Sequence, residues 1–99
     1  MTISAAIQIL PKAENTKDVI RIVDEVIAYI KSTGISYYVG PFETTFESDD
    51  FDLVMQIIAS CQKIAIGSGC DSVSSYVKIV YNPKGGVLTI DEKVSKYNG

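Results

Sequence analysis

Side chains suited to ligand binding gather in one segment of the chain, residues 37–47. Aromatic rings, two threonine hydroxyls and two carboxylates surround a bend at Gly40-Pro41. An aromatic ring offers a stacking surface, a hydroxyl orients polar ligand atoms, and a carboxylate accepts from an amino or cationic group. The combination favours a pocket for an amino-bearing or positively charged heterocycle. A plain hairpin, in which Tyr and Thr serve strand propensity alone, is the alternative.

The absence of histidine from all 99 residues narrows the possible chemistry. Without it the chain has no histidine general base, no Ser-His-Asp triad and no histidine-ligated metal. Any catalytic chemistry would have to rest on carboxylates, lysine, tyrosine or cysteine. We expect a protein that binds a ligand without catalysing a reaction, and that needs neither a metal nor a cofactor.

Three further motifs have structural explanations. Cys61 falls in the apolar stripe of a predicted helix and is expected to be buried, whereas Cys70 lies in a Gly-Ser-Gly-Cys-Asp turn and is expected to be accessible. The glycines of 67–69 follow a helix, while a phosphate-binding loop precedes one. The acidic run 49–52 is explained by the favourable interaction of carboxylates with a helix N-terminus.

Length and charge limit the class of protein. The 99 residues suit a single domain, 1–99, with a net charge of −3 and nine basic residues that form no cluster. This distribution argues against nucleic-acid binding. No apolar stretch approaches the roughly 20 residues of a membrane span, and residues 1–4 carry no basic side chain. We expect a cytoplasmic protein with reduced thiols and no membrane partner.

Apolar periodicity predicts four strands and two long helices, since alternation marks a strand and recurrence at three and four residues marks a helix. The expected elements are a strand over 3–10, a helix capped by Asn15 or Thr16 and stopped at Gly34, strands over 35–39 and 43–48, a helix capped by Ser48 and ending at Gly67 or Gly69, a strand over 73–81, and a short terminal helix over 90–97.

This order of elements predicts an α+β, ferredoxin-like βαββαβ fold. Its four-stranded antiparallel sheet has the spatial order 4-1-3-2, with both long helices on one face. The second face stays bare and includes Ala6, Leu10, Tyr76 and Val80. A half-apolar bare face favours self-association, so we expect a homodimer or homotetramer formed through it.

The sequence resembles the YkoF-like thiamine-binding family of small ferredoxin-like proteins. The resemblance covers nearly the whole chain and is most specific in residues 38–41, 44–47 and 90–97. It implies a ferredoxin-like fold, homo-oligomers that are often tetramers, and binding of thiamine or its hydroxymethylpyrimidine part. It implies no catalytic residues.

Four residues form the predicted ligand site. Thr44, Thr45 and Glu47 match the family pattern, and Tyr38 is added on its chemistry as a stacking surface. Because strand side chains alternate, we expect one of the two threonines to contact the ligand.

Other classes of ferredoxin-like protein fit the sequence poorly. The loop 12–16 has neither the C-x-x-C of a metal chaperone nor the arginine of an acylphosphatase, and the chain is too acidic for RNA recognition. The remaining alternative is a structural or regulatory oligomeric domain without a vitamin ligand.

Overall fold

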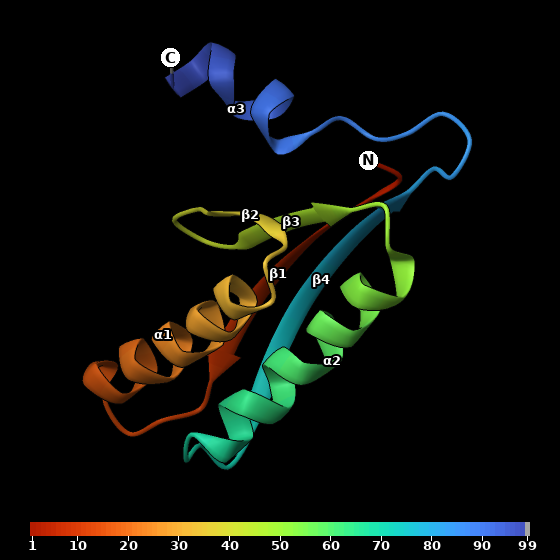
Figure 1. Cartoon of the computed structure of the whole chain (residues 1–99). Coiled ribbons are helices and arrows are strands. Elements are labelled where there is room, and N and C mark those ends of the chain that lie inside the picture. Colours follow the sequence, from red (N-terminus) through yellow and green to blue (C-terminus); the bar gives the residue numbers. More distant parts are fainter. Residues whose placement is uncertain (99) are drawn as a thin grey trace.

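Four antiparallel strands form one sheet in the spatial order β2-β3-β1-β4, in a computed structural model that describes residues 1–98 (Figure 1). The elements are β1 (Ile3–Pro11), α1 (Thr16–Ser32), β2 (Ser36–Val39), β3 (Thr44–Ser48), α2 (Phe51–Gly67), β4 (Val73–Tyr81) and α3 (Ile90–Asn98). The strand order is 4-1-3-2 read from the other edge. The predicted ferredoxin-like α+β fold is confirmed.

Strand β1 is central and supplies the middle of the hydrophobic core. It pairs antiparallel with β3 on one side and with β4 on the other. Its odd-numbered side chains face α1 and α2, and its even-numbered side chains face the opposite side of the sheet, as strand alternation requires. The largest fully buried side chains come from both strands and helices: Phe46, Ile3, Ile22, Ile30, Ile57, Val54 and Cys61.

Side-chain caps set the helix starts. Asn15 Oδ1 accepts from the Asp18 amide at 2.9 Å, which confirms the first of the two predicted caps of α1. The predicted Ser48 cap of α2 is wrong, because Asp50 is the cap and accepts from the Leu53 amide at 3.0 Å. Ser48 is still paired in β3, and its hydroxyl accepts from the Asp50 amide at 2.9 Å. It therefore shapes the turn that leads into the helix.

Both cysteines are buried. Cys61 is fully enclosed in the core, and burial raises the pKa of its thiol to about 11. The prediction that Cys70 is accessible is wrong, since this side chain is 6% exposed and its thiol donates to the Ala65 carbonyl at 3.1 Å. The turn folds back against the end of α2, and that contact could not be read from the sequence near Cys70.

The face of the sheet turned away from α1 and α2, here called the open face, is partly covered by α3. Strand register places the even-numbered residues of β1 and β4 on it, together with Thr45 and Glu47 of β3. Leu10, Tyr76 and Val80 are exposed there as predicted, while the small Ala6 is buried between its neighbours. No helix within residues 1–98 is long and apolar enough to cross a membrane.

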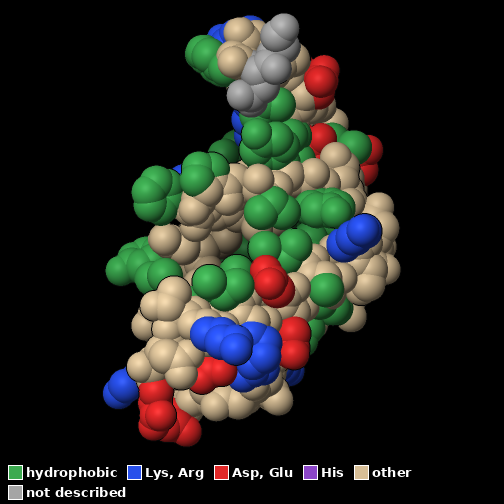
Figure 2. Space-filling model, turned by 90° about the vertical axis from the view of Figure 1, so that its left-hand side faces the viewer, with side chains coloured by type: hydrophobic (Ala, Val, Ile, Leu, Met, Phe, Trp, Pro, Cys, Tyr) green, Lys and Arg blue, Asp and Glu red, His purple; other side chains and the backbone are tan. Residues whose placement is uncertain are grey.

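Seen from the side that carries the β2–β3 hairpin and α1, hydrophobic side chains gather across the middle of the molecule (Figure 2). Charged side chains concentrate below them, toward the N-terminal end of α1. Exposed apolar surface of this kind is common where proteins meet partners.

Candidate functional site

The strand register separates the predicted site residues into two groups. Tyr38 lies opposite Thr45, and Glu47 lies in the same row of the sheet as Ser36 and Ser4. These pairings bring Tyr38, Thr45 and Glu47 together on the open face. Thr44 faces the other way, is 7% exposed, and lines a small apolar groove between the hairpin and α1. The structure therefore unites three of the four predicted residues.

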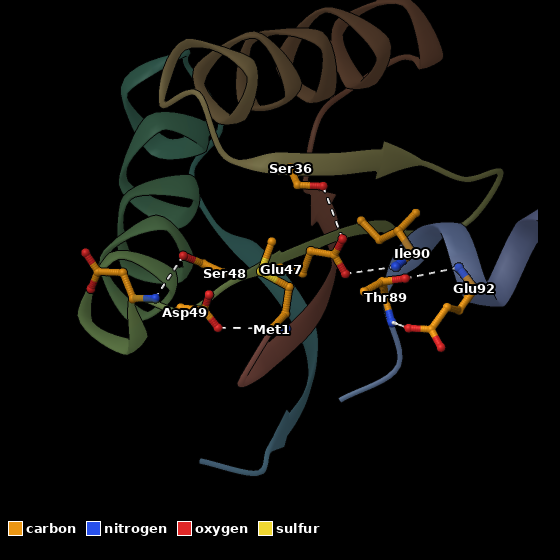
Figure 3. A network of polar contacts seen from close by, with 9 residues as sticks. Met1, Ser36, Glu47, Ser48, Asp49, Thr89, Ile90 and Glu92 are labelled. Carbon is orange, nitrogen blue, oxygen red and sulfur yellow. Dashed lines mark hydrogen bonds and ion pairs between the residues drawn. The ribbon is translucent and has the colours of Figure 1, made fainter. Parts of the chain in front are cut away.

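Glu47 is the polar centre of the open face. Its side chain is 5% exposed, and both of its oxygens accept hydrogen bonds (Figure 3). The Ser36 hydroxyl donates to Oε1 at 3.2 Å, and the Ile90 backbone amide donates to Oε2 at 2.8 Å. An ionised carboxylate has about four acceptor positions. Two donors fix its orientation and occupy two of these positions.

The amide that binds Glu47 is the first of helix α3. A capping box precedes it, in which the Glu92 amide donates to Thr89 Oγ1 at 3.1 Å and the Thr89 amide donates to Glu92 Oε1 at 3.0 Å. Hydrogen bonding to Thr89 holds the pKa of Glu92 below its usual value. The larger effect comes from the Thr89 backbone amide and the smaller from the Thr89 side chain. The predicted terminal helix is confirmed, and its start is attached to the sheet through Glu47.

A cavity of about 270 Å³ lies on the open face beside this contact. Its volume is close to the lower end of the range typical of small-molecule sites, roughly 300–1,000 Å³. The lining residues are Ser4, Ala5, Ala6, Glu43, Thr45, Lys78, Val80 and Lys93. Glu47 borders it, because its cross-strand neighbour Ser4 and its same-face neighbour Thr45 both line the cavity.

Three charged side chains of this cavity are not among the four predicted site residues. Lys78 Nζ and Glu43 Oε1 form an ion pair at 2.8 Å, which spans β1 from β4 to the hairpin. Lys93 reaches in from α3 and donates to Ser4 Oγ at 3.3 Å. Ser4 and Lys93 are 89 positions apart, so no local pattern could have joined them. The available signal was Lys78, which is the one charged side chain of β4.

A larger cavity of about 460 Å³ lies at the far end of the sheet, lined among others by Lys12, Asp18, Arg21 and Asp71. Its acidic and basic groups face one another, and Arg21 lies 3.7 Å from both Asp18 and Glu25. None of the predicted site residues reaches it. Within residues 1–98, no three His, Cys, Asp or Glu side chains are grouped to hold a metal ion.

The fold is that of a small ferredoxin-like domain with a cavity on the open face of its sheet. The family model described as thiamine-binding protein matches residues 5–98, and the chain belongs to this family. The resemblance seen in the sequence is thereby confirmed.

Individual relatives match this chain over nearly its whole length. A UPF0045 protein of Clostridium perfringens is 48% identical over 96 residues, which cover 97% of each chain. The structure of a DUF77 domain of unknown function from Bacillus cereus matches with a TM-score of 0.85 and 36% identity, covering 97% of this chain and 89% of the other. A Thermotoga maritima protein provisionally assigned to thiamine biosynthesis or salvage matches with a TM-score of 0.83 and 30% identity, covering 98% and 99%.

Proposed function

We propose that this protein binds thiamine, or its hydroxymethylpyrimidine part, on the open face and leaves it chemically unchanged. The observation that carries the proposal is the buried carboxylate of Glu47, oriented by two donors at the border of a cavity. Membership of the thiamine-binding protein family supports the class of ligand. The provisional assignment of the Thermotoga maritima neighbour to thiamine biosynthesis or salvage supports it as well.

Each proposed contact matches a feature of an aminopyrimidine. The exocyclic amino group donates hydrogen bonds, and an ionised carboxylate such as Glu47 is the strongest side-chain acceptor for them. The Thr45 hydroxyl lines the cavity and can donate to a ring nitrogen. The exposed ring of Tyr38, in the strand opposite Thr45, offers a stacking surface. In this arrangement Thr44 lies on the helix side of the sheet and does not contact the ligand.

We also propose that the open face joins two copies of the chain, as a homodimer or as part of a homotetramer. Tyr76, Val80 and Leu10 are exposed on it, and a second sheet packed there would remove them from water and enclose the cavity. The same observation favours the second candidate function, a structural or regulatory oligomeric domain with no vitamin ligand. The cytoplasm is the proposed compartment, since Cys61 and Cys70 are both unpaired thiols.

The test begins with the small molecules released from purified, denatured protein, identified by mass spectrometry. Calorimetric titration with thiamine and hydroxymethylpyrimidine follows, on the parent chain and on Glu47→Gln. We expect saturable binding by the parent and a loss of about ten- to a hundredfold in the variant, the usual effect of removing a hydrogen bond to a charged group. Asp24→Asn, which makes the same charge change on the exposed surface of α1, is the control and should bind like the parent.

Two results would contradict the proposal. Equal binding by Glu47→Gln and the parent would exclude this carboxylate as the acceptor of the ligand. A parent chain that retains no such molecule and binds neither compound would leave the structural or regulatory oligomer as the function.

A further inference from the structure

The open-face cavity contains two ammonium groups that an aminopyrimidine does not need. Lys78 enters from β4 and Lys93 from α3, so two successive elements of the chain direct positive charge into one small volume. Within residues 1–98, no carboxylate lies within 4.0 Å of Lys93, whose ammonium donates to the Ser4 hydroxyl. A basic side chain whose bonding partner is a neutral hydroxyl keeps most of its capacity to bind an anion.

We propose that Lys78 and Lys93 form an anion subsite, and that the ligand is a phosphate monoester. This inference rests on the proposed function and specifies its ligand: the aminopyrimidine alcohol esterified with phosphate, or thiamine esterified in the same way. A phosphate monoester carries a charge of about −1.5 to −2 near neutral pH and presents three strong acceptor oxygens. Lysine is a common phosphate ligand because its ammonium is a compact charge with three donors.

The placement of the two lysines fits such a ligand. Lys78 lies opposite Ala6 in the sheet, Ala6 also lies opposite Thr45, and all three residues line the cavity. A pyrimidine held by Glu47 and Thr45 would therefore direct its esterified substituent over β1 toward Lys78. The Ser4 hydroxyl, which accepts from Lys93, still has its own proton to donate to a phosphate oxygen.

The positive charge of the cavity also determines which of the candidate ligands should bind more tightly. The thiazolium ring of thiamine is cationic, so two ammonium groups in the same cavity oppose its binding, and a phosphate ester offsets that repulsion. The neutral pyrimidine alcohol meets no such penalty and gains the full attraction when it is phosphorylated. The cavity therefore favours phosphorylated over unphosphorylated forms of either compound.

Glu43 is the one lining carboxylate that competes with the ligand for Lys78. The side chain of Lys78 is 71% exposed, and an exposed ion pair of this kind is weak. Lys78 can exchange it for a phosphate dianion at small cost. Removing the charge of Glu43 should then strengthen phosphate binding, whereas removing the charge of either lysine should weaken it.

The experiment compares calorimetric affinities for hydroxymethylpyrimidine, its phosphate ester, thiamine and thiamine monophosphate, on the intact protein. We expect each phosphate ester to bind at least about tenfold more tightly than its parent alcohol, the effect of a charge-assisted contact. Lys78→Gln and Lys93→Gln should each reduce that ratio, and Glu43→Gln should increase it. Lys63→Gln on the exposed surface of α2, the same charge change on the helix side, should leave it unchanged.

The outcomes separate the two proposals. If the unphosphorylated compounds bind and phosphorylation adds nothing, the anion subsite is wrong and the proposed function stands. If the ratio falls equally in Lys63→Gln and Lys93→Gln, the effect is one of net charge and the subsite is again wrong. If none of the four compounds binds, both proposals fail. A preference for one phosphate ester over the other identifies whether the pyrimidine or the complete vitamin is the ligand.

Discussion

At the scale of single residues, the adjacent Thr44 and Thr45 distinguish most clearly between the two faces of the sheet as the place of ligand binding. One hydroxyl points into the open-face cavity and the other lies toward the helices, beside an apolar groove. Valine keeps the shape of threonine and removes its hydroxyl, so the same substitution can be made on both faces of one strand.

We predict that Thr45→Val weakens ligand binding by roughly tenfold, the value of one lost hydrogen bond. Thr44→Val should bind the ligand like the parent, because its side chain is directed away from the cavity. Calorimetric titration of both variants with hydroxymethylpyrimidine measures the difference, and the circular dichroism of each verifies its folding. The reverse pattern would place the ligand in the groove beneath the hairpin.

At the scale of elements, α3 is attached to the rest of the fold through two carboxylates. The Glu92 side chain closes its capping box, and Glu47 accepts from its first amide. Hydrogen bonding lowers the pKa of Glu92 in the folded chain. The resulting stabilisation of α3 is present above the pKa of the unfolded chain and is lost as the pH falls through the lowered value in the folded chain.

We predict that acidification below about pH 4 frees α3 before the sheet unfolds. Hydrogen exchange at the Thr89 and Ile90 amides should accelerate there, while amides in the centre of β1 stay protected. Glu92→Gln keeps the shape of the capping box without a titrating group, so it should reduce this pH dependence. An unchanged profile in the variant would show that the capping box does not control the attachment.

The elements were predictable because their signals are local. Asn15 before an apolar stripe and Gly34 after it mark the two ends of α1, and Gly34 indeed adopts a φ of 78°. The helix cap at Ser48 and the exposure of Cys70 were predicted wrongly for the same reason. In both cases tertiary contacts, which the local sequence does not reveal, determine the structure. Ser48 stays in β3 and leaves the cap to Asp50, and Cys70 is buried by the return of its turn onto α2.

The site could be predicted in part for the same reason. Alternation required that Thr44 and Thr45 lie on opposite faces, but the register with β1 decides which of them meets the cavity. The link between Glu47 and Ile90 joins residues 43 positions apart, and the cavity depends on Lys93 at a still larger separation from Ser4. Such contacts arise from the packing of α3 on the sheet, about which the sequence pattern of either element says nothing.

At the scale of the whole molecule, the uneven coverage of the sheet predicts association. Two helices cover one face, whereas α3 covers a limited part of the other (Figure 1). We predict that sedimentation equilibrium at micromolar concentration gives two or four times the chain mass of 10.8 kDa. Val80→Lys should shift the protein toward the single chain, because a charge buried between two sheets is strongly unfavourable.

Ile20→Lys is the matched control, since Ile20 of α1 is 56% exposed and Val80 is 58% exposed. This variant should keep the assembly of the parent. A parent protein that sediments as one chain would contradict the prediction. Dissociation by Ile20→Lys with an intact Val80→Lys assembly would move the interface to the helix side.

A map of backbone amide shifts during titration with hydroxymethylpyrimidine tests most directly whether a small heterocycle binds on the open face beside Glu47. We expect saturable shifts at Ala6, Thr45 and Glu47, and at Ile90 because its amide donates to the Glu47 carboxylate. The groove beside Val26 and Phe42 should be unaffected. Shifts confined to that groove, or no saturable shift at any amide, would contradict ligand binding beside Glu47.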